Sequence, residues 1–181
     1  MARAVPIDPY WARTYFDLGE LQIGGGDLEG ARQTLEELSR INQDAVTVAG
    51  RFWESLLRAE IERTAGHLDL AQEAINQFDA MAQEYRWAHF EHIGRARLVA
   101  ASGDVEGAMS AYQAALDPRS WEGWPAVASS TTTLLELARL QDEVGDTENA
   151  RRHYQEYLDR WGDADPPVVA ADEVRARLAE L

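Results

Sequence analysis

Two histidines stand three positions apart in the segment His89-Phe90-Glu91-His92. On a helix, side chains at this spacing share a face and could supply two of the ligands that a zinc ion takes in proteins. The sequence specifies no third ligand, because the other histidines, His67 and His153, lie far away along the chain. We therefore expect His89 and His92 to be packing or solvent-facing residues. A helical enzyme, or a metal or small-ligand site on this side, is the less favoured alternative.

The other residues that usually carry catalysis are absent or unsuitably placed. The chain has no cysteine and all 17 of its basic residues are arginine, which removes thiolate nucleophiles, Schiff-base lysines and phosphate-loop lysines. Gly24 to Gly26 follow a helical pattern and lack the spacing of a phosphate loop. No carboxylate lies in an apolar context suited to acid–base work. We predict a protein that is not an enzyme and uses no cofactor and no metal.

The chain is strongly acidic. Its 181 residues include 32 acidic and 17 basic ones, which gives a formal net charge of −15. Such a surface repels phosphate, so we expect neither nucleic acid nor an anionic membrane as a partner. No apolar run is long enough to span a membrane, the start carries no apolar signal segment, and the lack of cysteine fits a reducing compartment. We expect a cytoplasmic location.

A glycine followed by an alanine five positions later occurs four times, at intervals of about 40 residues. A small residue precedes each glycine by seven positions, and a large one follows each alanine by four. A glycine can take the left-handed backbone where a helix ends, and the small and large residues fit two helices that interlock as a hairpin. An Asp that can cap the next helix follows the glycine at three corners, and His67 follows it at the fourth. The four pairs are Gly26/Ala31, Gly66/Ala71, Gly103/Ala108 and Gly145/Ala150.

The pattern predicts a single all-α domain over residues 1–181, built as an α-solenoid of about four hairpins. The third helix is expected to start near Asp44. A short helix at 168–181 is expected to cap the open end. In the first helix, apolar or aromatic residues recur at a helical spacing, and we expect them to form its apolar face. These residues are Trp11, Tyr15, Leu18 and Leu21. The expected repeats are 9–43, 44–86, 87–123 and 124–165.

Asp8 can cap the first helix, but no helix that would cap the solenoid is evident before Asp8, which leaves two alternatives for this end. In the first, Tyr10 or Trp11 is exposed, which would permit self-association or an upstream unit. In the second, both residues pack on the first hairpin.

These offsets resemble the tetratricopeptide repeat. The first unit matches best, with Leu18-Gly19, Gly26-Asp27, Ala31 and Leu35. The resemblance covers about residues 9–165 and implies a right-handed solenoid of tetratricopeptide-like hairpins. The units are longer than the usual length of about 34 residues, and HEAT repeats are the alternative fold. The Trp of the family pattern is replaced in all four units, by Tyr15, Ser55, His92 and Leu134.

The tail, from Tyr157 to Pro166 and from Ala176 to Leu181, is similar to the ends of tetratricopeptide modules in bacterial multidomain regulators. Those regulators include serine/threonine kinases, nucleotide cyclases and transcription activators. The resemblance implies a sensor or docking part of a larger protein, or a free-standing adaptor.

In the family, the first helices of the hairpins line a concave groove that binds a protein or peptide. The resemblance places aromatic and arginine side chains on this groove, which suit a ligand with apolar and acidic anchors. The alternative is that the aromatic residues are core and that the arginines pair internally, with Glu20 and Glu60. The groove residues implied are Arg13, Phe16, Glu20, Trp53, Leu56, Arg63, Phe90, Arg97 and Arg139.

Trp121 and Trp124 lie in the longest segment that does not read as a helix. Two exposed tryptophans are costly in water, so they either pack over the adjacent helix or contact a partner or a second copy in a homodimer.

The function favoured by the sequence as a whole is protein–protein interaction, and the alternative is a homo-oligomerising structural spacer.

Overall fold

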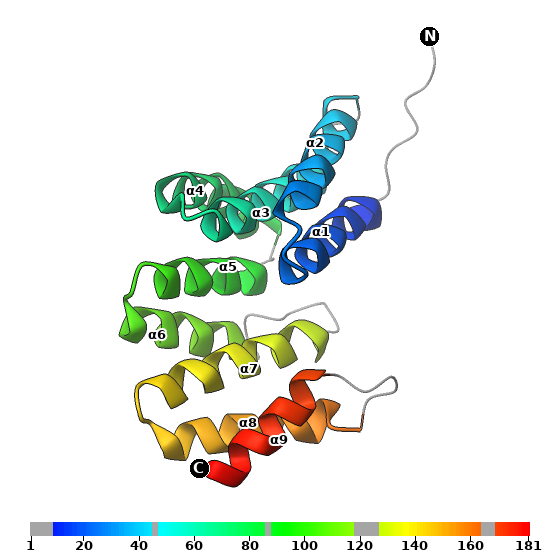
Figure 1. Ribbon diagram of the computed structural model, residues 1–181. Helices are drawn as coiled ribbons and strands as arrows, with labels where there is room; N and C mark the ends of the chain where they lie inside the picture. Colours follow the sequence, from blue (N-terminus) through cyan, green and yellow to red (C-terminus); the bar gives the residue numbers. More distant parts are fainter. Residues whose placement is uncertain (1–8, 45–46, 86–87, 118–126, 164–168) are drawn as a thin grey trace. The chain divides into compact units, whose positions relative to one another are not determined.

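The computed structural model describes residues 9–44, 47–85, 88–117, 127–163 and 169–181 (Figure 1). Within these ranges, side chains are described except at 9–10, 44, 78–85, 88–91, 127–131 and 169. Every regular element in the described ranges is an α-helix, which confirms the all-α helical-repeat prediction. The handedness of the solenoid stays a prediction, as do the repeat boundaries.

The contacts between helices divide the chain into two compact units, residues 1–87 (unit 1) and 88–181 (unit 2). In each unit, consecutive helices pair as hairpins (Figure 1). Unit 1 contains α1 (Pro9–Gly24), α2 (Leu28–Asp44), α3 (Val48–Thr64) and α4 (Leu68–Tyr85). Unit 2 contains α5 (Ala88–Ala101), α6 (Val105–Leu116), α7 (Val127–Glu143), α8 (Thr147–Trp161) and α9 (Val169–Glu180).

The expected start of the third helix near Asp44 is wrong by several residues. Helix α2 continues to Asp44, and α3 begins only at Val48. The reason is a local cap, because the Thr47 hydroxyl accepts a hydrogen bond of 2.9 Å from the Gly50 N–H. A side chain in this position satisfies one of the free N–H groups of the first helical turn, so it fixes where the helix begins.

The four predicted glycine corners have the same backbone geometry. Gly26, Gly66, Gly103 and Gly145 all have positive φ, between 78° and 86°. At the first corner, the Asp27 N–H donates to the Gln22 carbonyl and the Gly26 N–H donates to the Ile23 carbonyl. The same pair of bonds recurs at the other three corners. This is the Schellman arrangement, which satisfies the last carbonyls of a helix and favours glycine at its left-handed position.

The predicted aspartate caps form at three of these corners. The carboxylates of Asp27 and Asp104 each accept a hydrogen bond of 2.9 Å from the N–H three residues later, and that of Asp146 accepts one of 3.4 Å. At the fourth corner, the imidazole of His67 lies 2.7 Å from a Glu62 carboxylate oxygen instead. Helices α2, α6 and α8 therefore begin on a carboxylate that satisfies one of their first N–H groups.

The small residues of the repeat lie where helices approach most closely. The four repeat alanines are fully buried, and the large residues four positions later are buried too. At Gly19, an added Cβ would come within 2.3 Å of the Leu57 Cδ1, so glycine permits α1 to pack close to α3. The interlocking of small and large residues predicted for the hairpins is confirmed. The large residues are Leu35, Ile75, Tyr112 and Tyr154.

Helix α9 closes unit 2 as the sequence predicted. Its Ala171 and Val174 are buried in a cluster with Leu135, Tyr154 and Tyr157 from α7 and α8. Leu178 and Leu181 pack against the same cluster. The outer side of α9 carries exposed charged residues, among them Asp172, Glu173, Arg175 and Glu180. A helix with one apolar and one charged face is suited to end a stack of hairpins.

The apolar residues predicted to share a face of α1 do share one, but this face is exposed and lies outside the core of unit 1. The buried residues of α1 are Ala12, Phe16 and Gly19, whereas Trp11, Leu18 and Leu21 are 62%, 45% and 74% exposed. Helix α1 carries apolar residues on two faces, and only the Phe16 face contributes to the core of unit 1. The exposure of Trp11 agrees with one of the two alternatives for the start of the chain.

Candidate protein-binding surface

The aromatic residues expected in the groove form part of the core of unit 1. The ring centroids of Phe16 on α1 and Trp53 on α3 are 5.2 Å apart, and Phe52 meets Trp53 edge-on at 4.9 Å. Phe16, Trp53 and Leu56 are all buried. Aromatic pairs at these distances stabilise the packing of two helices. Their contact with a ligand stays a prediction, and the side chain of Phe90 lies outside the described residues.

Arg13 lies at the edge of this aromatic cluster. Its guanidinium carbon is 5.8 Å from the ring centroid of Trp53, and its Nε is 3.5 Å from an Asp17 carboxylate oxygen. About a quarter of the Arg13 side chain is exposed, and Glu20 on the same helix is half-buried. Arg13 therefore covers Trp53 through a cation–π contact and presents a charge to solvent.

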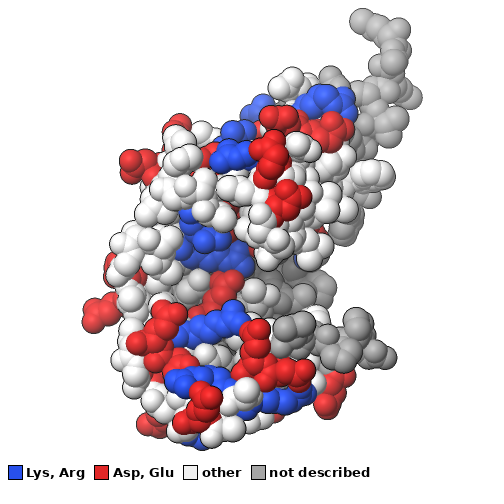
Figure 2. All heavy atoms as spheres, in the orientation of Figure 1, with Lys and Arg blue, Asp and Glu red and all other residues white. Residues whose placement is uncertain are grey.

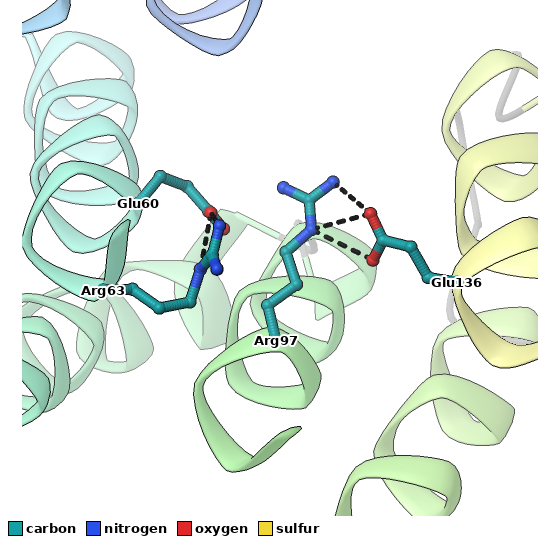
Figure 3. Close-up of polar contacts among 4 residues, drawn as sticks. All are labelled: Glu60, Arg63, Arg97 and Glu136. Carbon is teal, nitrogen blue, oxygen red and sulfur yellow. Dashed lines mark hydrogen bonds and ion pairs between the residues drawn. The ribbon is translucent and has the colours of Figure 1, made fainter. Parts of the chain in front are cut away.

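Arg63 pairs with the acidic residue one helical turn before it on α3. Its Nε and one terminal nitrogen lie 3.0 Å and 2.7 Å from the same Glu60 oxygen (Figure 3). Glu60 is almost fully buried, and a buried carboxylate is costly unless a positive partner accompanies it. The sequence alternative that named Glu60 as an internal partner is thus correct for Arg63.

In unit 2, arginines link the first helices of successive hairpins. Arg97 on α5 donates to both carboxylate oxygens of Glu136 on α7, at 2.8 to 3.1 Å (Figure 3). Both side chains are largely buried, at 15% and 24% exposed. Forked arginine–carboxylate pairs of this kind are the strong, directional ones, so this pair fixes α5 against α7.

Two further pairs continue the series from α7 to α9. Arg139 on α7 approaches Glu173 on α9 at 3.2 Å. Arg177 on α9 forks onto Asp142 on α7 at 2.7 and 2.8 Å, and the Tyr154 hydroxyl donates to Asp142 at 3.4 Å. The hydrogen bonds from Arg177 hold the pKa of Asp142 below its usual value.

Together these contacts form an ion-pair ladder, made of Arg97–Glu136, Arg139–Glu173 and Arg177–Asp142. Figure 2 shows arginine and acidic side chains intermixed over the part of unit 2 that holds α7 and α9. Arg97 and Arg139 were predicted on the first helices of the hairpins, but their acidic partners were not predicted. A signal was present, because each of these arginines precedes its glutamate by 39 or 34 residues, close to one repeat.

The other candidate sites gain no support from the described residues. Trp121, Trp124 and the side chain of His89 lie outside them, and His92 is half-buried. Among the described residues, no group of three or more His, Cys, Asp or Glu side chains is arranged to hold a metal ion. No helix in the described ranges is both long enough and apolar enough to cross a membrane.

Residues 132–164, which hold most of α7 and all of α8, match the family model of the tetratricopeptide repeat. No curated protein and no solved structure matches the chain significantly. The α7–α8 hairpin is therefore identified as a tetratricopeptide repeat, which supports the family resemblance for this part of the chain. Such repeats generally mediate protein–protein interaction and are generally not catalytic.

Proposed function

We propose that this chain binds a protein or an extended peptide across the first helices of its hairpins, with Arg139 on α7 as a contact for an acidic group. The ion-pair ladder of unit 2 carries the proposal. It places arginines, each already oriented by a carboxylate, in a row that runs from α5 through α7 to α9. Guanidinium groups held in this way suit the carboxylates of a ligand.

The exposure of each pair decides which arginine can change partner. Arg139 and Glu173 are 50% and 61% exposed, and such a surface pair contributes only about 0–1 kcal/mol to stability. Turning Arg139 toward a ligand therefore costs little. Arg97 and Glu136 are less exposed and doubly bonded, so separating them costs more. We assign the ligand contact to Arg139 and a positioning role to Arg97.

Unit 1 offers charged rather than aromatic contacts. Arg13 and Arg63 are each about a quarter exposed, whereas Trp53 and Phe16 are buried. Replacing Trp53 with alanine would open a cavity that costs roughly 3–5 kcal/mol, so it would test folding rather than binding. In unit 1 we propose Arg13 and Glu20 as ligand contacts. Arg63 is doubly bonded to the buried Glu60, so we assign it a positioning role like that of Arg97.

The charge of the whole chain limits the kind of ligand. A net charge of −15 repels a strongly acidic partner, so we expect a few acidic groups among apolar ones rather than an acidic tract. Charge pairing of this kind contributes more to specificity and association rate than to affinity. The similarity of the tail to bacterial regulators supports a docking or adaptor role in the cytoplasm.

The proposal can be tested with peptides selected from a random display library on the immobilised chain. We expect Arg139→Glu to weaken the binding of the selected peptides by about tenfold or more, as measured by fluorescence anisotropy. Arg151→Glu is the matched control, because Arg151 is exposed on α8 and the change in charge is identical. Circular dichroism establishes that both variants keep their helices.

Two results would contradict this assignment. One is a library from which no peptide is retained above background. The other is an equal loss of affinity in the Arg139 and Arg151 variants, because the effect would then come from net charge alone.

A further inference from the structure

Helix α1 exposes an uncharged surface, which we call the α1 face. It consists of Trp11, Thr14, Tyr15, Leu18 and Leu21. At 3.6 residues per turn, these five share one side of the helix. The charged residues Arg13, Asp17 and Glu20 lie on another side. Three large apolar side chains are exposed on this one helix face, which is typical of a surface that packs against another molecule or segment.

The equivalent residues of α7 show what kind of contact the α1 face can make. Counted back from the corner glycine, Tyr15, Leu18 and Leu21 of α1 occupy the same positions as Leu134, Leu137 and Leu140 of α7. The α7 residues are only 2%, 0% and 9% exposed. Leu137 and Leu140 pack on Ala96, Ala108 and Tyr112 of the preceding hairpin. No hairpin within the described residues packs on the α1 face, which corresponds to this surface of α7 and suits another helix.

A second copy of this chain fits the α1 face, because two uncharged faces can meet without burying a charge. Two chains of net charge −15 repel each other, and an uncharged surface lets them approach without bringing charges together. The other end of the chain offers no match for this face, because the outer side of α9 is charged. A head-to-tail stack would therefore bury charge against Trp11 and Leu21, whereas a two-fold pairing buries apolar residues on both sides.

We propose that this protein forms a two-fold symmetric dimer through the α1 face, with the α1 helices of the two copies packed against each other. One helix face per copy lies at the low end of interface sizes, below about 1,200 Å² in total. The dimer is therefore in equilibrium with monomer, with a dissociation constant on the order of micromolar. Salt tightens it, because screening weakens the repulsion between the two acidic chains.

Sedimentation velocity over roughly 1 to 200 µM tests the proposal with one variant and one control. Leu21→Glu puts a charge into the proposed contact and raises the dissociation constant by about tenfold or more. Leu70→Glu makes the same change at an exposed leucine of α4, which is 50% exposed against 74% for Leu21, and it leaves the constant unchanged. Both positions face solvent in the single chain, so neither variant should unfold it. Leu21→Glu should also leave peptide binding through Arg139 unaffected, which separates this test from that of the binding function.

A cross-link locates the contact. The chain has no cysteine, so Leu18→Cys adds one thiol near the middle of α1, and mild oxidation joins two copies into a covalent dimer. Leu70→Cys, the control, stays monomeric on the same non-reducing gel. A wild-type chain that remains monomeric over the whole range overturns the proposal. A dimer that Leu21→Glu does not weaken, or that Leu70→Glu weakens equally, overturns it as well.

Discussion

His153 is a buried histidine, and its contacts determine which of its two ring nitrogens carries the proton. Its Nδ1 lies 2.7 Å from the Gln141 side-chain oxygen, which can only accept, so Nδ1 carries the hydrogen. Its Nε2 lies 3.4 Å from a terminal nitrogen of Arg152, which can only donate, so Nε2 is left without a proton. Both contacts fit the neutral ring. Burial, and then the charge of Arg152, lower the pKa of His153 from its ordinary value.

This shift predicts a pH dependence of stability. A histidine with a lowered pKa in the folded state binds its proton more readily in the unfolded chain. The stability it contributes is therefore present above the unfolded value of about 6.5 and is lost as the pH falls toward the folded pKa. The slope from one such group is at most about 1.4 kcal/mol per pH unit. Urea unfolding of the wild type and His153→Gln, compared between about pH 5 and 8, should show a flatter profile for the variant.

The titration of Asp142 does not interfere with this measurement, because it occurs at more acidic pH. Its pKa is lowered by Arg177, so its contribution is present above the unfolded value of 3.8 and is lost at more acidic pH. Parallel profiles for the wild type and the His153 variant would show that His153 does not titrate with folding.

At the scale of the elements, two glycines at the end of α1 separate the effect of backbone strain from the effect of side-chain space. Gly24 and Gly26 lie two residues apart at the end of α1, and an added Cβ would meet nothing within 4 Å at either. Only Gly26 has a positive φ, of 79°. A side chain at both positions therefore finds space, but at Gly26 it also meets the strain of the left-handed backbone.

We expect Gly26→Ala to lower the free energy of unfolding by about 1–2 kcal/mol. Gly24→Ala should leave it unchanged or raise it by up to about 1 kcal/mol, because alanine restricts the unfolded chain and favours helix. Urea titration followed by circular dichroism measures both. Equal effects of the two substitutions would mean that the corners do not need glycine for its backbone freedom.

The repeat itself was predictable from sequence, because its signals are local. A corner glycine, an aspartate cap and a small residue at a close approach each act within a few residues, and α6 and α8 begin immediately after the predicted caps Asp104 and Asp146. The exposed face of α1 was not predictable by the same reasoning. Trp11, Leu18 and Leu21 have helical periodicity, but so do Ala12, Phe16 and Gly19, and periodicity does not say which face meets a neighbour.

The candidate surface was predictable in part. The family resemblance placed Arg97 and Arg139 on the first helices, where the structure has them. It did not supply Glu136 or Glu173, because an ion pair between helices depends on how successive hairpins stack. The same limit applies to Trp53, whose burial against Phe16 results from the packing of α1 on α3.

At the scale of the whole molecule, unit 2 has what an independent fold requires. The described residues of its Ala96–Tyr112–Leu140 cluster and its Leu135–Tyr154–Val174 cluster all belong to unit 2, and α9 covers the last hairpin. In a repeat protein, stability is approximately a sum over units and their nearest neighbours, so a segment with its own core and cap can fold without the rest.

We therefore expect a fragment of residues 88–181 to be helical and to unfold cooperatively on heating, as followed by circular dichroism at 222 nm. Val174→Asp, which puts a charge into the buried contact of α9, tests the contribution of the cap. This change should lower the stability of the fragment by about 3 kcal/mol or more, because it leaves a charge buried without a partner. Asp172→Ala, at an exposed position of the same helix, should change it by about 0.5 kcal/mol or less. A fragment that is unfolded at room temperature, or that tolerates both substitutions equally, would show that the stability of unit 2 depends on residues 1–87 rather than on its own two clusters.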